Sequence, residues 1–235
     1  MVNINILNLL YIIIFHTKYK EGIDLEGSSE YIYNELKIRI INLQYKPGEL
    51  INEKDLVEEF KVSRTPIREA LLKLSEKNWV RFVPRVGIYV SQIDLKHIKN
   101  AYEVKKSLEA LACELASVRA TEDEIKDILS IVAEMESYDT KTEYSKIIQA
   151  DQVFHRRISE ISKNELLAST LEDVNSEIAR FLQHIRYVID DPQWFHRSLQ
   201  GIAYAIRDRD PKKANIEAQN HSDAFLIKLT KMFFC

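Results

Sequence analysis

The spacing of apolar residues in the first ninety positions predicts three helices followed by a β-hairpin. Apolar side chains recur at every third or fourth position over residues 31–43, which is typical of a helix with one buried face. Shorter helices are expected over residues 53–60 and from residue 63 onward, joined by a tight turn. Residues 80–83 and 88–90 are instead rich in β-branched and aromatic side chains, with Pro and Gly between the two runs. The pattern therefore predicts a winged helix-turn-helix.

The helix that begins near Ser63 carries the side chains expected of a DNA-recognition helix. Ser63 is a good N-cap, and Pro66 lies in the first turn, where its missing N–H does no harm. Arg64 and Arg68 place guanidinium groups at the N-terminal end, which is the end that enters the major groove of DNA. With the hairpin tip and the preceding helix added, the expected DNA-contacting residues are Lys54, Ser63, Arg64, Thr65, Arg68, Arg85 and Gly87. The alternative is a helical hairpin that packs against something other than DNA.

Residues 30–91 resemble the DNA-binding domain of the GntR family of bacterial transcription regulators. The resemblance rests on Pro47-Gly48, on the run Ser63-Arg64-Thr65-Pro66-Ile67-Arg68-Glu69-Ala70-Leu71, and on the hairpin with Pro84 and Gly87. It implies a homodimer that presents two recognition helices to a pseudo-palindromic operator in double-stranded DNA. Most such relatives are repressors, so repression is the expected mode.

From residue 94 to the C-terminus the periodicity is helical, and no strand-like alternation follows residue 90. Asp94 and a capping box that begins at Thr121 mark two helix starts, and prolines at 192 and 211 mark two more. The expected helices cover about residues 94–120, 121–138, 142–162, 165–189, 192–207 and 211 to the end. The first should bury an apolar stripe of Leu95, Ile98, Tyr102, Leu108, Leu111, Ala112 and Leu115. The fold class is therefore mainly α, with an antiparallel all-α bundle over residues 92–235 for effector binding and dimerisation.

The helical region is similar to the effector-binding domain of the FadR C-terminal type, the FCD domain, which occurs in one large GntR subfamily. The matching residues are Tyr102-Glu103-Val104-Lys105 with Leu108-Glu109, Asp151 with Phe154-His155, Ser162 with Asn164, and Ala205-Ile206, Asp210, Ala214 and His221. The resemblance implies that a small carboxylic acid bound in the bundle changes operator binding. In some members of the subfamily a metal ion takes part.

Asp151 and His155 lie four residues apart on one expected helix, so their side chains share a face and can hold one divalent cation. The resemblance adds His221 as a third ligand, with Zn²⁺, Mn²⁺ or Ni²⁺ as the ion. The family's fourth ligand position falls on Leu199, and the nearest histidine is His196, about one helical turn away. The site thus has three protein ligands, or four if a shifted helix start brings in His196. Without a metal, Asp151 would simply orient His155 in a polar patch.

Lys105, Asn164 and Arg180 are the residues expected to contact the effector. Lys105 stands where the family usually has arginine. Lysine offers a point charge instead of two parallel hydrogen bonds, so an anionic effector would be held differently. Arg180 would reach the cavity from the fourth helix of the bundle, although a surface or ion-pair role is the simpler interpretation.

Composition fits this division of the 235 residues, of which 46 % are hydrophobic and 29 % charged. Residues 30–92 carry 11 Lys and Arg against 9 Asp and Glu, whereas the residues from 96 onward carry 20 against 23, so a mildly basic head precedes an acidic body. Cys113 and Cys235 form no motif, which favours reduced thiols in a cytoplasmic protein. Residues 1–29 are an extension whose apolar part is too short to span a membrane. Disorder, a helix packed on the body, or an over-long start are its alternatives.

The sequence therefore predicts a DNA-binding transcriptional regulator, with no membrane partner, rather than an enzyme. The first alternative is a metal-sensing regulator, in which the cation itself is the signal. A metal-dependent enzyme is a remote alternative, because no general base, nucleophile elbow or phosphate loop accompanies the aspartate and histidines.

Overall fold

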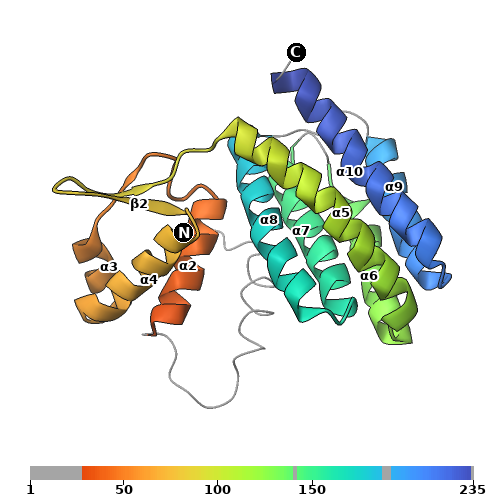
Figure 1. Cartoon of the computed structure of the whole chain (residues 1–235), viewed down its shortest axis with the longest axis horizontal. Coiled ribbons are helices and arrows are strands. Elements are labelled where there is room, and N and C mark those ends of the chain that lie inside the picture. The colour runs from red at the N-terminus through yellow and green to blue at the C-terminus, as the bar shows by residue number, and fades with distance from the viewer. Residues whose placement is uncertain (1–27, 140–141, 187–191, 234–235) are drawn as a thin grey trace. The chain divides into compact units, whose positions relative to one another are not determined.

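The computed structural model describes residues 28–139, 142–186 and 192–233. The expectations for the first 27 residues and for Cys235 lie outside these ranges. The chain divides into two units, one ending at Ile93 and the other beginning at Asp94 (Figure 1). Both are mostly helical, and each has its own hydrophobic core. The predicted mainly α fold class is confirmed.

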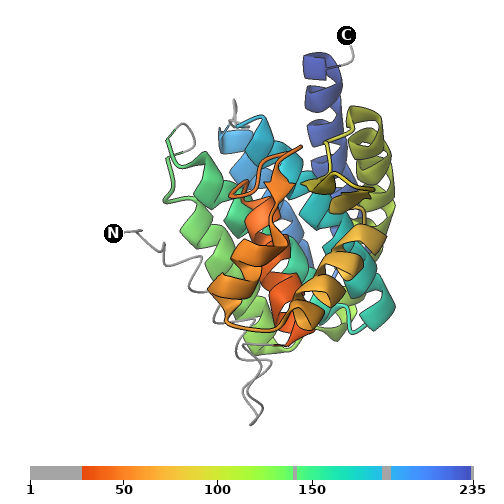
Figure 2. The same ribbon diagram turned by 90° about the vertical axis from the view of Figure 1, so that its left-hand side faces the viewer.

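The first unit is a winged helix-turn-helix, drawn in red to yellow in Figure 2. Its helices are α2 (Ser29–Ile41), α3 (Glu53–Phe60) and α4 (Arg64–Glu76), and its strands are β1 (Leu50–Ile51), β2 (Val80–Val83) and β3 (Gly87–Val90). The strands are antiparallel, and β3 lies between β1 and β2. The sequence did not predict β1, because a strand of two residues is too short to show a period of two.

Local side-chain chemistry sets the helix boundaries in this unit. Ser28 and Asn52 accept hydrogen bonds from backbone N–H groups in the first turns of α2 and α3, so both residues cap their helices. α3 ends at Lys61, whose left-handed backbone (φ 54°) turns the chain toward α4. The helices and the sheet then share one apolar core, formed by Ile32, Leu36, Ile40, Leu56, Ile67, Leu71, Leu74 and Trp79. This core fixes the direction in which α4 presents its first turn.

The second unit is a helical bundle. Its helices are α5 (Leu95–Arg119), α6 (Glu122–Met135), α7 (Tyr144–Ile161), α8 (Glu165–His184), α9 (Pro192–Arg207) and α10 (Pro211–Phe233). α5 is the central element, because α7, α8, α9 and α10 all pack against it, with α10 running along its length (Figure 1). The predicted cap at Asp94 and the capping box from Thr121 to Glu124 are present. Asp210 likewise accepts a hydrogen bond from the first turn of α10.

The buried face of α5 differs from the predicted apolar stripe. Leu95 and Leu111 are exposed, whereas Lys105 and Glu109 are only 6 % and 3 % exposed. The buried positions follow the alternating spacing of three and four that begins at Ile98, and this spacing carries a lysine and a glutamate into the core. The stripe prediction was wrong at these positions because it assumed that charged residues stay outside.

Two helices end earlier than the periodicity indicated. α6 stops at Met135, and Ser137 and Tyr138 continue it only as a turn. α8 stops at His184, and Arg186 takes a left-handed conformation (φ 49°) that cannot continue a right-handed helix. Among the helices of the described ranges, none is both long and apolar enough to cross a membrane.

Candidate DNA interface and metal centre

The N-terminal end of α4 presents basic groups without acidic partners. Arg64 and Arg68 lie one turn apart and are exposed, and neither forms an ion pair within the part of the chain that the structure describes. Thr65 is exposed beside Arg64. Ser63 occupies the N-cap position as predicted, but its hydroxyl makes no capping hydrogen bond. The hydroxyl and the first N–H groups of α4 are therefore open to a phosphate oxygen.

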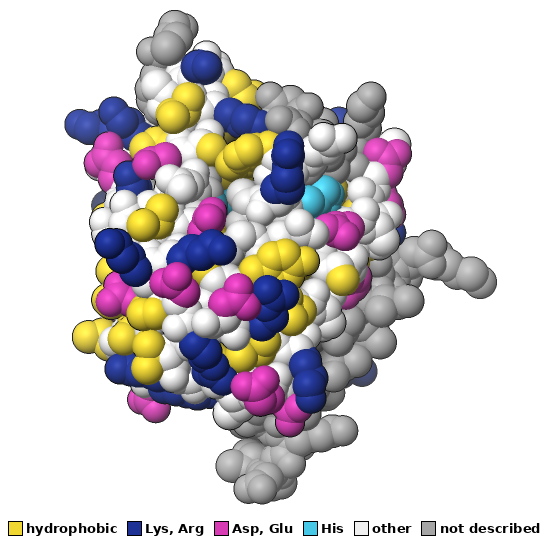
Figure 3. All heavy atoms as spheres, turned by 90° about the vertical axis from the view of Figure 1, so that its right-hand side faces the viewer, with side chains coloured by type: hydrophobic (Ala, Val, Ile, Leu, Met, Phe, Trp, Pro, Cys, Tyr) yellow, Lys and Arg dark blue, Asp and Glu magenta, His cyan; other side chains and the backbone are white. Residues whose placement is uncertain are grey.

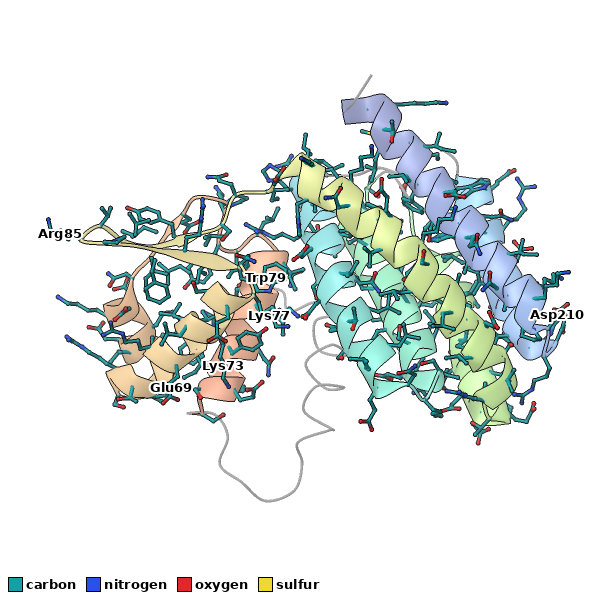
Figure 4. The ribbon with its side chains drawn as sticks, viewed as in Figure 1. Glu69, Lys73, Lys77, Trp79, Arg85 and Asp210 are labelled. Atoms are coloured by element: carbon teal, nitrogen blue, oxygen red, sulfur yellow. The ribbon has the colours of Figure 1, made fainter. Side chains whose placement is uncertain are left out.

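Two other basic residues of this unit, Arg39 and Lys73, form ion pairs. Arg39 of α2 contacts Glu35 at 2.9 Å and Glu59 at 2.6 Å, which ties α2 to the end of α3. Lys73, which lies along α4 in Figure 4, pairs with Glu30 at 2.7 Å. The N-terminal end of α4 therefore differs from the rest of the helix, because Arg64 and Arg68 form no ion pair within the described structure whereas Lys73 does. Lys54 is exposed on α3.

The β2–β3 hairpin forms the wing and carries Arg85 at its tip (Figure 4). The Val86 N–H donates to the Val83 carbonyl across a tight turn in which Arg85 is left-handed (φ 63°). Gly87 has φ 149°, and a Cβ added there would lie 2.7 Å from Leu50 Cδ1. The positive φ favours glycine at this position, because any other side chain would be strained there and would also displace the end of the Leu50 side chain, apart from any approach to DNA.

In the second unit, Asp151 and His155 of α7 meet His221 of α10. One ligand atom from each lies within 4.8 Å of the others, and both histidines are almost fully buried. Asp151 Oδ1 and His155 Nε2 are 3.4 Å apart, and neither makes a hydrogen bond within the described structure. One carboxylate oxygen and two imidazole nitrogens suit Zn²⁺, Mn²⁺ or Ni²⁺. His196 is not part of this group, and Leu199 is buried among apolar residues, so the arrangement supplies three protein ligands.

Residues from two further helices bond to the histidines. Glu109 Oε1 of α5 lies 2.9 Å from His155 Nδ1, and Ser198 Oγ of α9 lies 2.8 Å from His221 Nδ1. Lys105 Nζ donates to Glu109 at 2.5 Å and to the Asn175 side-chain oxygen at 2.7 Å. The sequence pattern indicates no role for Glu109, Asn175 or Ser198. Only the four-residue spacing of Lys105 and Glu109, typical of a helical ion pair, was visible there.

Burial and neighbouring charges act against each other in this cluster. Burial disfavours the charged form of His155, but Glu109 and Asp151 outweigh it and raise the pKa of His155 to about 9. Burial and the charge of His155 together lower the pKa of His221 to about 4. Burial acts to raise the pKa of Glu109 and of Asp151, yet the adjacent cations hold both below the ordinary range. A cation that binds here therefore displaces a proton from His155.

A cavity lies beside the cluster, between α5, α7, α8 and α10. The centre of a water-sized sphere can move through about 20 Å³ of it, little more than one water needs. Besides the three clustered residues, its lining includes Tyr102, Lys105, Gln152, Asn175, Ser222 and Phe225. Of the residues expected to touch an effector, only Lys105 lines this cavity. Asn164 caps α8 by accepting from the Leu167 N–H, and Arg180 is buried outside the lining set.

Two protein-family models match the chain. The model described as "Bacterial regulatory proteins, gntR family" matches residues 28–90, and the FCD domain model matches residues 100–224. The chain belongs to the GntR family, with an FCD domain as its second unit. The resemblance noted from the sequence is thereby confirmed.

Curated relatives are named as transcriptional regulators. The HTH-type transcriptional regulator YdhC of Bacillus subtilis (strain 168) is 35 % identical over 159 residues, which cover 67 % of this chain and 70 % of the relative. The Nta operon transcriptional regulator of Aminobacter aminovorans is 31 % identical over 145 residues, 62 % and 68 % of the two chains. The HTH-type transcriptional repressor RspR of Escherichia coli (strain K12) is 24 % identical over 186 residues, 77 % and 80 %. This GntR protein is therefore a transcriptional regulator and not an enzyme.

Solved structures agree on the fold. McbR/YncC of E. coli superposes with a TM-score of 0.75 at 19 % identity and covers 90 % of this chain and 100 % of its own. A putative GntR regulator from Rhodococcus sp. RHA1 has a TM-score of 0.70 at 18 % identity, with 87 % and 98 % covered. At these identities the likeness establishes the shared fold alone.

Proposed function

We propose that this GntR regulator is a homodimeric, FadR-type repressor. A small carboxylic acid, bound through a metal ion in the FCD domain, controls its affinity for operator DNA. The observation that carries the DNA-binding part is the pair of exposed, unpaired guanidinium groups at the start of α4. Repression is supported by the name of one relative, the repressor RspR.

Each predicted DNA-contacting residue of the first unit has a role in the proposed complex. Arg64 and Arg68 read guanine edges or grip phosphates in the major groove, as side chains at this end of a recognition helix do. Ser63 and Thr65 bind phosphate oxygens beside the helix N-terminus. Lys54 contacts the backbone from α3. Arg85, with Gly87 in the same hairpin, lies along the minor groove.

An apolar stripe on α5 supports the dimer. Val104, Leu111 and Val118 follow one another at intervals of seven residues, so they share a helix face, and all three are exposed. Clustered exposed apolar residues on a helix are typical of an interface with another helix. On the face that Figure 3 shows, apolar side chains are interspersed with acidic and basic ones.

The cluster formed by Asp151, His155 and His221, called the FCD cluster below, supports the proposal that a metal ion binds the acid. Asp151, His155 and His221 would hold the ion, and the ion would supply the positive charge and open coordination positions that bind a carboxylate. Because α5 is the helix that follows the DNA-binding unit along the chain, and Tyr102 and Lys105 of α5 line the cavity, a ligand in the cavity acts on the helix that is linked to that unit.

The size of the cavity favours a second candidate function, a regulator that senses the metal itself. About 20 Å³ accommodates an ion and a water but not an organic acid, unless the side chains around it move apart. The two candidates differ in whether the metal alone, or only the metal with an acid, changes operator affinity.

The experiment that tests the DNA-binding proposal compares two variants at opposite ends of α4. Arg64→Ala should weaken binding to a fragment of the regulator's own promoter region about 10- to 100-fold, because a base or phosphate contact is lost. Lys77→Ala, at the C-cap of the same helix, should bind as wild type does. Fluorescence anisotropy measures both, and circular dichroism checks that both are folded. If Arg64→Ala bound this DNA with the affinity of wild type, the first turn of α4 would not be the part that reads DNA.

A further inference from the structure

The two histidines of the FCD cluster are each held at Nδ1 by a residue from a different helix. Glu109 of α5 bonds to His155, and Ser198 of α9 bonds to His221. Asp151 and His155 lie on α7 and His221 on α10, so the cluster and its supports draw on four helices. The hydrogen-bond chemistry of the two supports decides which imidazole nitrogen is left for a metal.

Ser198 acts on His221 as an acceptor. A hydroxyl has one proton to donate, and Ser198 Oγ lies 2.7 Å from the Phe195 carbonyl oxygen, which can only accept. The bond between Ser198 and His221 Nδ1 must then run the other way, with Nδ1–H donating to the hydroxyl. His221 therefore keeps its lone pair on Nε2.

Glu109 acts on His155 in the same way. An ionised carboxylate only accepts, so His155 Nδ1–H donates to Glu109, and Nε2 points to the Asp151 carboxylate. Glu109 is itself fixed, because Lys105 Nζ and the Asn175 side-chain amide both donate to the same oxygen. With 3 % of its surface exposed, this carboxylate is held entirely by protein partners.

We propose that Glu109 and Ser198 are the positioning residues of the metal centre, and that Lys105 serves to hold Glu109 rather than to bind the effector. A carboxylate or hydroxyl behind a metal-binding imidazole fixes the ring and its tautomer, and loss of such a partner typically weakens metal binding 10- to 100-fold. The inference rests on the proposed metal site, and it replaces the effector role that the sequence suggested for Lys105.

The test uses two double variants that remove the same charges. Lys105→Met with Glu109→Gln keeps a side-chain oxygen that can accept from His155, whereas Lys105→Met with Glu109→Leu does not. Both eliminate the buried ion pair without leaving one member unpaired, so both are expected to fold. Zn²⁺ affinity is measured by competition with a chromophoric chelator, and the visible absorption of bound Co²⁺ reports the ligand geometry.

The Lys105→Met/Glu109→Gln variant should bind Zn²⁺ with an affinity within a few-fold of wild type and keep the Co²⁺ spectrum. The Lys105→Met/Glu109→Leu variant should bind Zn²⁺ about 10- to 100-fold more weakly, and its Co²⁺ spectrum should be altered. Ser198→Ala should give a smaller loss in the same direction. Glu114→Gln is the matched control, because Glu114 also lies on α5 and bonds to α10 through Asn215, away from the cluster.

The outcomes separate the two levels of the argument. If wild type binds neither Zn²⁺ nor Co²⁺, the metal site proposed above is wrong. If wild type binds Zn²⁺ but the two double variants bind it as tightly as each other, Glu109 is only the counter-ion of Lys105, and the positioning role is overturned. Circular dichroism and operator binding of each variant show that a lost affinity does not come from an unfolded protein.

Discussion

In the DNA-binding domain the cations proposed to contact DNA, Arg64 and Arg68, are exposed and unpaired within the described structure, whereas in the FCD domain Lys105 and His155 are buried and both bond to the buried Glu109. The difference fits what each region is proposed to bind. DNA phosphates and base edges arrive from outside, so the groups that meet them must stay in water until then. An ion inside a bundle needs ligands that are already oriented, and burial in turn requires that every charge have a partner.

The comparison predicts that equivalent charge deletions have unequal costs in the two domains. Lys105→Ala should lower the free energy of unfolding of the FCD domain by about 3–5 kcal/mol, because Glu109 is left buried without its nearest cation. Lys73→Ala removes an exposed pair with Glu30 and should cost about 0.2–1 kcal/mol. Urea unfolding of both variants measures the two values. Equal costs would mean that the buried pair is hydrated after all.

Zn²⁺ should stabilise one domain and not the other. At a free concentration 100 times the dissociation constant, a metal that binds only the folded state adds about 2.7 kcal/mol. The two tryptophans separate the domains, since Trp79 lies in the head and Trp194 in the bundle. In a variant that keeps only Trp194, tryptophan fluorescence should report a higher melting temperature when Zn²⁺ is added. In a variant that keeps only Trp79, the melting temperature should not change.

Asp151→Asn should abolish the effect of Zn²⁺ on the Trp194 transition. Adding carboxylic acids with and without Zn²⁺ then distinguishes the two candidate functions. Further stabilisation by an acid only when Zn²⁺ is present supports the acid-responsive regulator, whereas a change of operator affinity with Zn²⁺ alone supports the metal sensor.

The metal-free FCD domain should also lose stability as the pH rises. The pKa of His155 is about 9 in the folded protein against 6.5 unfolded, so its stabilising proton is fully held below pH 6.5 and is lost as the pH approaches 9. Between pH 6.5 and 8.5 the loss should be about 2 kcal/mol, measured by urea unfolding in EDTA.

His221 acts in the opposite direction and in a different window. Its pKa of about 4 destabilises the folded state as the pH falls from 6.5 toward 4, so the metal-free domain should be most stable near pH 6.5. His155→Gln should remove the slope above pH 6.5, and His97→Gln, an exposed histidine outside the cluster, should leave it unchanged. A slope that survives His155→Gln would contradict the assignment.

The smallest expected effect concerns the wing. Arg85 is left-handed, a conformation that glycine adopts without strain, so Arg85→Gly should stabilise the head by about 0.5–1 kcal/mol. The same change should weaken operator binding several-fold, because a phosphate or groove contact is lost. Asn78→Gly replaces another left-handed residue and should leave affinity unaltered. Unchanged affinity of Arg85→Gly would show that the wing tip does not touch DNA.

Much of the fold followed from local patterns. The caps at Asp94 and Thr121 and the recognition-helix start at residue 64 were predicted, because a cap depends on residues within one turn. The strand β1 was missed, since two residues become a strand only when β3 lies beside them. The candidate site could be predicted only in part: Asp151 and His155 share a face by spacing, while His221 came from the family resemblance.

By itself, the sequence determined where helices begin and that a cationic turn opens α4, because these features depend on neighbours a few positions apart. Tertiary structure decided the rest. It brought Glu109 against His155, 46 positions later in the chain, and Ser198 against His221, and it put Leu199 rather than His196 in the core. A charge can stay in a core only when other helices supply its partners, and no local pattern records which helices those are.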